Sequence, residues 1–293
     1  MITTLLTAPL AATSAASLAI AYARRLSAAG ERTLVIDADA SGSTLAGRLG
    51  EATGESYSAA RRGLPSLIAS RSELSPELLG AHVELLDYPS ATVPVLLGAS
   101  HPNGGRYGIE WLAGRVGELA AALSSAGVHA VIAATLRTPV PELGILLRAG
   151  HTLLVAPATP LDLLRGAAGL LRFVVPEAGH ETGAPTMLVV EGLTKIAGDH
   201  VHAAVGLEVA GEIPLVNDNM LLARNAGRRG RELTRSLDSV IETMRASMLR
   251  AAEATRFRAD ALTPSELPAE VDEVCAAPSA GAPLGETAVR GNS

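Results

Sequence analysis

Residues 1–39 read MITTLLTAPLAATSAASLAIAYARRLSAAGERTLVIDAD, and this stretch decides the fold. An apolar run, Ile2–Thr7, leads into a loop of small residues, PLAATSAAS. A helical pattern follows over Ala12–Ala29 and ends at Gly30, before a second apolar run, Thr33–Ile36. The order strand, loop, helix, strand predicts a βαβ unit. In such a unit the loop and the start of the helix lie at the carboxyl end of the first strand, where backbone N–H groups suit an anion.

Short apolar runs alternate with helical patterns along the rest of the chain, which predicts parallel strands joined by crossover helices. Several runs are apolar throughout, as expected of strands that are covered on both faces. We therefore expect an α/β fold with a doubly wound, mostly parallel sheet of about seven or eight strands flanked by helices. The expected strands are Ile2–Thr7, Thr33–Ile36, Val93–Gly98, Val128–Ala134, Thr152–Pro157, Pro185–Val190 and Val209–Ile213. The expected helices are Ala12–Ala29, Ile109–Ser125, Pro160–Val174 and Arg231–Arg256.

Composition indicates one large domain, residues 1–260, and a Pro/Ala/Gly-rich tail, residues 261–293, that we expect to be disordered. The formal net charge is −6, which disfavours broad binding to nucleic acid or to an anionic membrane. The N-terminus lacks the basic start of a signal peptide, and no segment reaches ~18 uninterrupted apolar residues. We expect a cytoplasmic protein without a transmembrane segment, which partners could hold at the inner face of the membrane.

The expected last helix carries one apolar stripe at helical spacing, formed by Leu233, Leu237, Ile241, Met244 and Met248. A stripe packed on the sheet is the favoured interpretation. The alternative, an amphipathic membrane anchor, is opposed by the acidic residues Glu232, Asp238 and Glu242, because membrane-surface helices favour a basic polar face.

The chain resembles the ParA/MinD superfamily of P-loop ATPases from residue 1 to about residue 250. The stretches that carry this resemblance are the first βαβ unit through DADASGSTL, then VHAVIAAT, HTLLVAPATPLDLLRGA and VAGEIPLVNDNMLLARNAGR. The middle segment, GLPSLIASRSELSPELLGAHVELL, looks like the CpaE/TadZ-like branch, which is associated with pilus and secretion-system assembly and with septum-site regulation. The resemblance implies a P-loop NTPase fold of the deviant Walker A type and a homodimer.

The loop lacks the groups with which this superfamily holds phosphate. A working P-loop needs glycines, a lysine that reaches the β- and γ-phosphates, and a Ser or Thr that binds magnesium. The lysine position is Ala15, the magnesium position is Ala16, and the only lysine of the chain is Lys195. The degenerate loop that would face a cofactor comprises Ala11, Ala12, Thr13, Ser14, Ala15, Ala16 and Ser17. We therefore expect no cofactor, with weak binding of ATP and Mg²⁺ as the alternative.

The acidic positions of the pocket are only partly kept. Asp37 and Asp39 end the second strand, where a catalytic pair would orient water and magnesium, and we interpret them as vestigial caps and turn formers. The resemblance implies an aspartate at the end of VHAVIAAT, but Ala134 stands there. It also implies a base-reading asparagine near Glu191 and an adenine contact near Pro214. A carboxylate cannot donate a hydrogen bond to a base as an amide can.

These losses lead to one favoured function and two alternatives. The favoured function is that of a pseudo-ATPase that positions or assembles a pilus, secretion or septum-site apparatus through protein contacts, without metal or catalytic residues of its own. The first alternative is a dimerising switch that still responds to weakly bound ATP. The second is a partition-type protein that binds DNA non-specifically through the cluster Arg224, Arg228, Arg229, Arg231 and Arg235. The sequence names neither the partner nor the apparatus.

Overall fold

The computed structural model describes residues 1–157, 160–175, 186–192, 198–223 and 228–262. The chain divides into two units, Met1–Ala252 and Glu253–Ser293, and the sheet and the loop belong to the first. Residues 263–293 lie outside the described part, so the expected disorder of the tail stays a prediction. Lys195 lies outside it as well.

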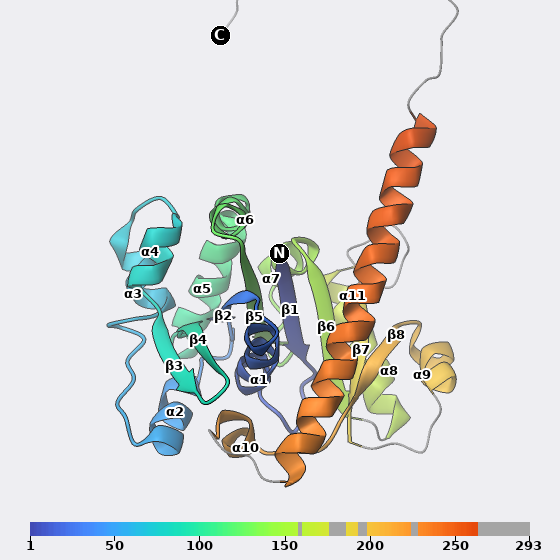
Figure 1. The fold of residues 1–293 in the computed structure, drawn as a ribbon, viewed down its shortest axis with the longest axis horizontal. Coiled ribbons are helices and arrows are strands. Elements are labelled where there is room, and N and C mark those ends of the chain that lie inside the picture. Colours follow the sequence, from blue (N-terminus) through green and yellow to red (C-terminus); the bar gives the residue numbers. More distant parts are fainter. Residues whose placement is uncertain (158–159, 176–185, 193–197, 224–227, 263–293) are drawn as a thin grey trace, which may run out of the picture. The chain divides into compact units, whose positions relative to one another are not determined.

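The described strands form one eight-stranded sheet in the order β3-β4-β2-β5-β1-β6-β7-β8 (Figure 1). All neighbours pair in parallel except the edge pair β3 and β4, which is antiparallel. The doubly wound, mostly parallel sheet predicted from the sequence is confirmed. The strands are β1 (Ile2–Thr7), β2 (Arg32–Asp37), β3 (Glu84–Tyr88), β4 (Ala91–Leu96), β5 (Val128–Thr135), β6 (His151–Pro157), β7 (Thr186–Glu191) and β8 (Glu208–Ile213).

Helices cover both faces of this sheet. Residues of α1, α2, α10 and α11 pack in one apolar cluster with the sheet, and residues of α3 to α9 pack in a second cluster on the other face. The helices are α1 (Ala15–Ala28), α2 (Leu45–Thr53), α3 (Leu64–Ser70), α4 (Pro76–Ala81), α5 (Pro102–Gly114), α6 (Val116–Ser125), α7 (Pro141–Arg148), α8 (Leu161–Val174), α9 (Gly198–Val205), α10 (Asp218–Leu222) and α11 (Arg228–Leu262). None of these described helices is long and apolar enough to cross a membrane.

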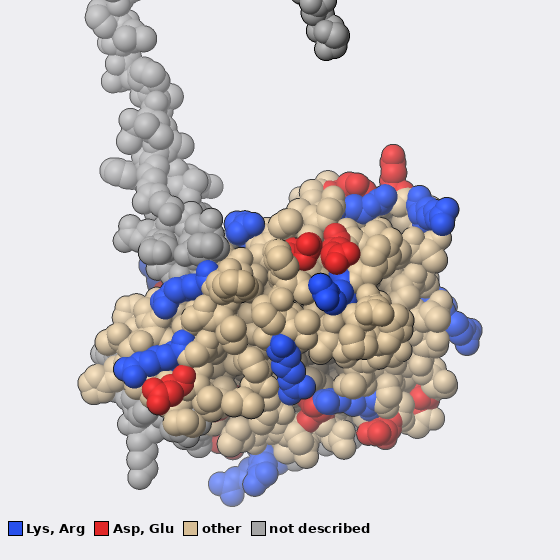
Figure 2. All heavy atoms as spheres, turned by 180° about the vertical axis from the view of Figure 1, so that it is seen from behind, with Lys and Arg blue, Asp and Glu red and all other residues tan. Residues whose placement is uncertain are grey.

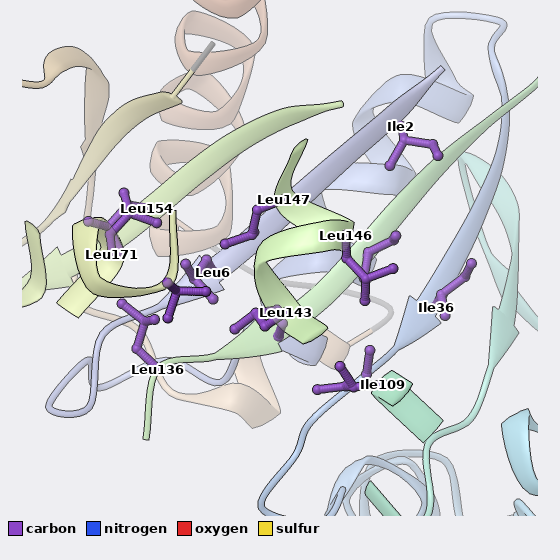
Figure 3. Close-up of a cluster of buried hydrophobic side chains, with 14 of the residues drawn as sticks. Ile2, Leu6, Ile36, Ile109, Leu136, Leu143, Leu146, Leu147, Leu154 and Leu171 are labelled. Atoms are coloured by element: carbon purple, nitrogen blue, oxygen red, sulfur yellow. The ribbon is translucent and has the colours of Figure 1, made fainter. Parts of the chain in front are cut away.

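Successive side chains of the central strand β1 divide between the two apolar clusters. Leu5 packs with α1 and α11, whereas Leu6 packs with α7 and α8 on the opposite face, and both are buried. Figure 3 shows Leu6 among leucines of α7 and α8. The buried face of α11 consists of Leu233, Leu237, Ile241 and Met244, so this stretch of the predicted stripe lies against the sheet. Burial on both faces explains why the central strands are rich in apolar residues on both sides, although β1 also buries Thr3 and Thr4.

The helices expected from the sequence did not include α2, α3, α4, α7, α9 and α10. Three further local features differ from the sequence prediction. The edge strand β3 was missed because ELLDY is short, charged and half-exposed. The predicted helix Ile109–Ser125 is two helices, interrupted at Arg115, where φ is −121° and ψ is 19°. The first helix begins at Ala15 and not at Ala12, because Ser14 is extended and its Oγ accepts a hydrogen bond from the Ser17 N–H.

Candidate functional site

The loop between β1 and α1, residues 8–14, lies at the carboxyl end of the central strand of the sheet. Strands β5 and β6 flank β1, so their carboxyl ends meet the loop. The Ala8 N–H donates to the Val155 carbonyl of β6, and the Ala11 N–H donates to the Ala8 carbonyl at 3.1 Å. These bonds turn the chain sharply before α1, and they leave the next three N–H groups to find other acceptors.

Glu191, the last residue of β7, supplies the acceptor for two of these groups. Its side chain is 1% exposed. Oε2 accepts from the Ala12 N–H at 2.6 Å, and Oε1 accepts from the Thr13 N–H at 2.9 Å and from the Thr13 hydroxyl. The carboxylate therefore closes on the loop with both oxygens, in the manner of a bound anion.

Asp218, the first residue of α10, binds the next N–H of the loop. Its Oδ1 accepts from the Ser14 N–H at 3.0 Å and from the Ser14 hydroxyl at 2.9 Å. Its other oxygen forms an ion pair with Arg48 of α2. Sequence reasoning missed both Asp218 and Arg48. The only local signal was NDNMLL, in which Asn217 caps α10 by accepting from the Met220 N–H at 2.9 Å.

Three consecutive loop N–H groups, those of Ala12, Thr13 and Ser14, are thus donated to carboxylates of this same chain. By the resemblance drawn from the sequence, they would belong to the stretch with which a P-loop cradles phosphate. Ala15 is buried and Ala16 carries no hydroxyl, so neither replaces a lysine or a magnesium ligand. The residues present therefore do not fit ATP and Mg²⁺.

Asp37 and Asp39 have separate environments. Asp37 is buried, and its Oδ2 accepts from the Ser43 hydroxyl and from the Gly98 N–H at 3.3 Å, while its Oδ1 has no hydrogen-bond partner among the described residues. Burial raises the pKa of Asp37 to about 6. Asp39 instead forms a turn, since its Oδ1 accepts from the Ser41 N–H at 2.8 Å and from the Ser41 hydroxyl at 2.6 Å.

The end of β5 faces the loop without a carboxylate. Ala134 is fully buried in the apolar core. Thr135 accepts from the Arg137 N–H at 3.2 Å, and Arg137 Nε donates to the Pro9 carbonyl at 3.3 Å. The predicted base-side residue Pro214 is buried, next to Ile213, whose carbonyl accepts from the Gly192 N–H. Ser17 is buried beneath the loop, where its hydroxyl lies 2.9 Å from the Ser14 Oγ and can donate to it.

The arginine cluster starts α11. Arg228, Arg229, Arg231 and Arg235 are exposed, whereas Arg224 lies outside the described residues. Figure 2, which views the molecule from behind, shows positive and negative side chains scattered over the visible face without separation by sign. Within the described ranges, no group of three or more His, Cys, Asp or Glu side chains could hold a metal ion.

Comparison with known proteins shows which fold class the chain has. No protein-family model matches the sequence. No curated protein matches it either. Solved structures do match, with nearly their whole length aligned. A ParA family ATPase from Chlorobium tepidum is 17% identical over 82% of this chain and 97% of that one, with a TM-score of 0.58.

Two further neighbours carry a partner or a nucleotide. The MinC:MinD cell division complex of Aquifex aeolicus matches with 14% identity over 85% of this chain and 96% of that chain, at a TM-score of 0.54. The septum site-determining protein MinD of Pyrococcus horikoshii, complexed with Mg-ADP, matches with 10% identity over 83% and 96%, at a TM-score of 0.53. The chain therefore has the ParA/MinD P-loop NTPase fold.

Proposed function

We propose that this protein is a ParA/MinD-like pseudo-ATPase, which positions or assembles other proteins through its surfaces and does not turn over ATP. The observation that carries this proposal is the carboxylate of Glu191, which takes the N–H groups of Ala12 and Thr13. Asp218 takes the N–H of Ser14 in the same way. The backbone N–H groups that would cradle a phosphate therefore already donate to carboxylates of the same chain.

Electrostatics makes these carboxylates and a nucleotide mutually exclusive. A phosphate placed in the loop would meet the negative charge of Glu191 in a buried setting, where like charges repel strongly. Expelling Glu191 would break hydrogen bonds to a charged group, each worth about 1.5–3 kcal/mol. No lysine offsets either cost, because Ala15 stands at that position. We infer an ATP affinity several orders of magnitude below that of a working P-loop.

The proposed partners are proteins of a pilus, secretion or septum-site apparatus, as the CpaE/TadZ-like middle segment implies. The fold supports a role of this kind, since one structural neighbour is MinD in complex with MinC. We also propose a homodimer in the cytoplasm, held at the inner face of the membrane through partners. Because the loop needs no phosphate to balance its N–H groups, this dimer forms without nucleotide.

Light scattering of the full chain tests this proposal. We expect a dimer whose fraction rises with protein concentration and is the same with and without ATP and Mg²⁺. A phosphate-release assay on the same sample should give no turnover above the buffer rate. A dimer that forms only with ATP would refute the scaffold and favour the nucleotide-responsive switch.

A second candidate function, non-specific DNA binding, is favoured by one observation. Arg228, Arg229, Arg231 and Arg235 are all exposed at the start of α11. If they contact phosphates, a gel shift at low salt should be lost on replacing the four with alanine, and should weaken steeply with added salt. The matched control replaces four other exposed arginines, Arg61, Arg62, Arg71 and Arg106, so that both variants lose the same charge. Equal binding by both variants would remove this candidate.

A further inference from the structure

Strands β2 and β4 are neighbours in the sheet but pair over only a short length. They meet at Val35↔Val95 and Ile36↔Leu96, whereas β2 pairs with β5 along its whole length. Pro94 stands immediately before the first paired residue of β4, and a proline has no N–H for the ladder. The amino-terminal halves of β2 and β4 therefore separate, at the end of the sheet opposite the loop.

A cavity of about 550 Å³ lies where the two strands separate. Its volume is within the ~300–1,000 Å³ range of small-molecule sites. Helices α4 and α6 contact each other beside it. Its walls are mostly apolar. They include Leu34 of β2, Leu79 of α4, Val83 just after α4, and Ala122 and Leu123 of α6. The cavity shares no lining residue with the loop at residues 8–14.

One cationic side chain lies at this cavity with most of its donors available. Arg32 is exposed, and its Nη1 donates to the Ala126 carbonyl at 2.6 Å, which holds the guanidinium beside the cavity. A guanidinium has five N–H donors, and this is the one hydrogen bond that the Arg32 side chain makes with the described residues. The other four can therefore bind an anion.

The remaining polar groups of the lining already have partners. Ser27 and Thr33 hydrogen-bond each other at 2.7 Å. Glu31 also lines the cavity, but its carboxylate is paired with Arg245 and lies 3.0 Å from His129 Nδ1. The negative charge of Glu31 is thus offset by Arg245. Arg32 is therefore the lining residue that would make the cavity favour an anionic ligand.

We propose that this cavity binds a small amphipathic monocarboxylate, such as a medium-chain fatty acid. The apolar chain would lie between the separated strands and the α4–α6 pair, where it removes apolar surface from water. The carboxylate would accept two N–H groups of Arg32, since a guanidinium matches a carboxylate in geometry and charge. This proposal is independent of the state of the loop.

Calorimetric titration of the full chain with decanoate tests the site. We expect saturable binding with one site per chain. Arg32→Gln should weaken decanoate binding about tenfold or more, but should change binding of the neutral decanol by less than about threefold. Ala91→Phe, which places an aromatic ring on the strand wall of the cavity, should abolish binding of both probes.

The matched control is Arg106→Gln, an exposed arginine on α5 outside the cavity lining, which should bind decanoate as the wild type does. Circular dichroism of each variant checks that it is folded. The proposal is overturned if the wild type binds no decanoate, if Arg106→Gln weakens binding as much as Arg32→Gln, or if a folded Ala91→Phe variant binds normally.

Discussion

Replacing Glu191 with glutamine should lower the free energy of unfolding by about 2–4 kcal/mol at pH 7. The carboxylate of Glu191 accepts from two backbone N–H groups and a hydroxyl while it is 1% exposed. A glutamine of the same shape keeps one accepting oxygen, but its NH₂ group faces a second N–H donor, which is left buried without an acceptor. Chemical denaturation of the two proteins measures the difference.

The matched control is Glu110→Gln on α5, because Glu110 is exposed. That change should shift the free energy of unfolding by less than about 0.5 kcal/mol. If Glu191→Gln is as neutral as Glu110→Gln, the carboxylate does not hold the loop, and the interpretation of Glu191 as an internal anion is wrong.

Asp37→Asn should stabilise the protein by about 1–3 kcal/mol above pH 6 and should have little effect near pH 4. Burial raises the pKa of Asp37 from 3.8 to about 6, so between these values the folded state binds more protons than the unfolded state. The ionisation of Asp37 therefore lowers the free energy of unfolding of the wild type as the pH rises from about 4 to about 6. Asparagine carries no charge, and its amide oxygen, in the place of Oδ2, can accept from both the Ser43 hydroxyl and the Gly98 N–H.

Urea denaturation at a series of pH values from 4 to 8 checks this prediction. The difference between Asp37→Asn and the wild type isolates Asp37, because His129 contributes equally to both proteins. Burial lowers the pKa of His129, so its contribution to stability is lost as the pH falls below the usual histidine value. The control is the exposed Asp87→Asn. A difference that does not change with pH would contradict the raised pKa.

The central part of the fold could be predicted from the sequence because both faces of its strands are buried. Runs such as Ile2–Thr7 and Val128–Thr135 are uncharged and mostly apolar or β-branched for that reason, and their alternation with helical patterns predicts a parallel sheet. The edge strand Glu84–Tyr88 could not be found in this way, since one of its faces meets water and it carries two acidic residues. The break at Arg115 lies between Gly114 and Gly117, but apolar residues continue at helical spacing on both sides, which predicted one helix.

The residues of the candidate loop can be named from the sequence, but their contacts cannot. Counting along the first helix located Ala15 and Ala16, so the missing lysine and hydroxyl were visible in the sequence. The bonds from Glu191 and Asp218 to the loop join residues 179 and 204 positions apart. Which way a carboxylate turns at the end of a strand depends on the neighbouring donors, and these are defined only when the sheet has assembled.

Isothermal titration of the wild-type chain with ATP and Mg²⁺ tests the central claim most directly. The claim is that the chain's own carboxylates occupy the donors of the loop. We predict no saturable heat, which corresponds to a dissociation constant weaker than about 1 mM. Saturable binding in the micromolar range, accompanied by release of phosphate, would contradict it.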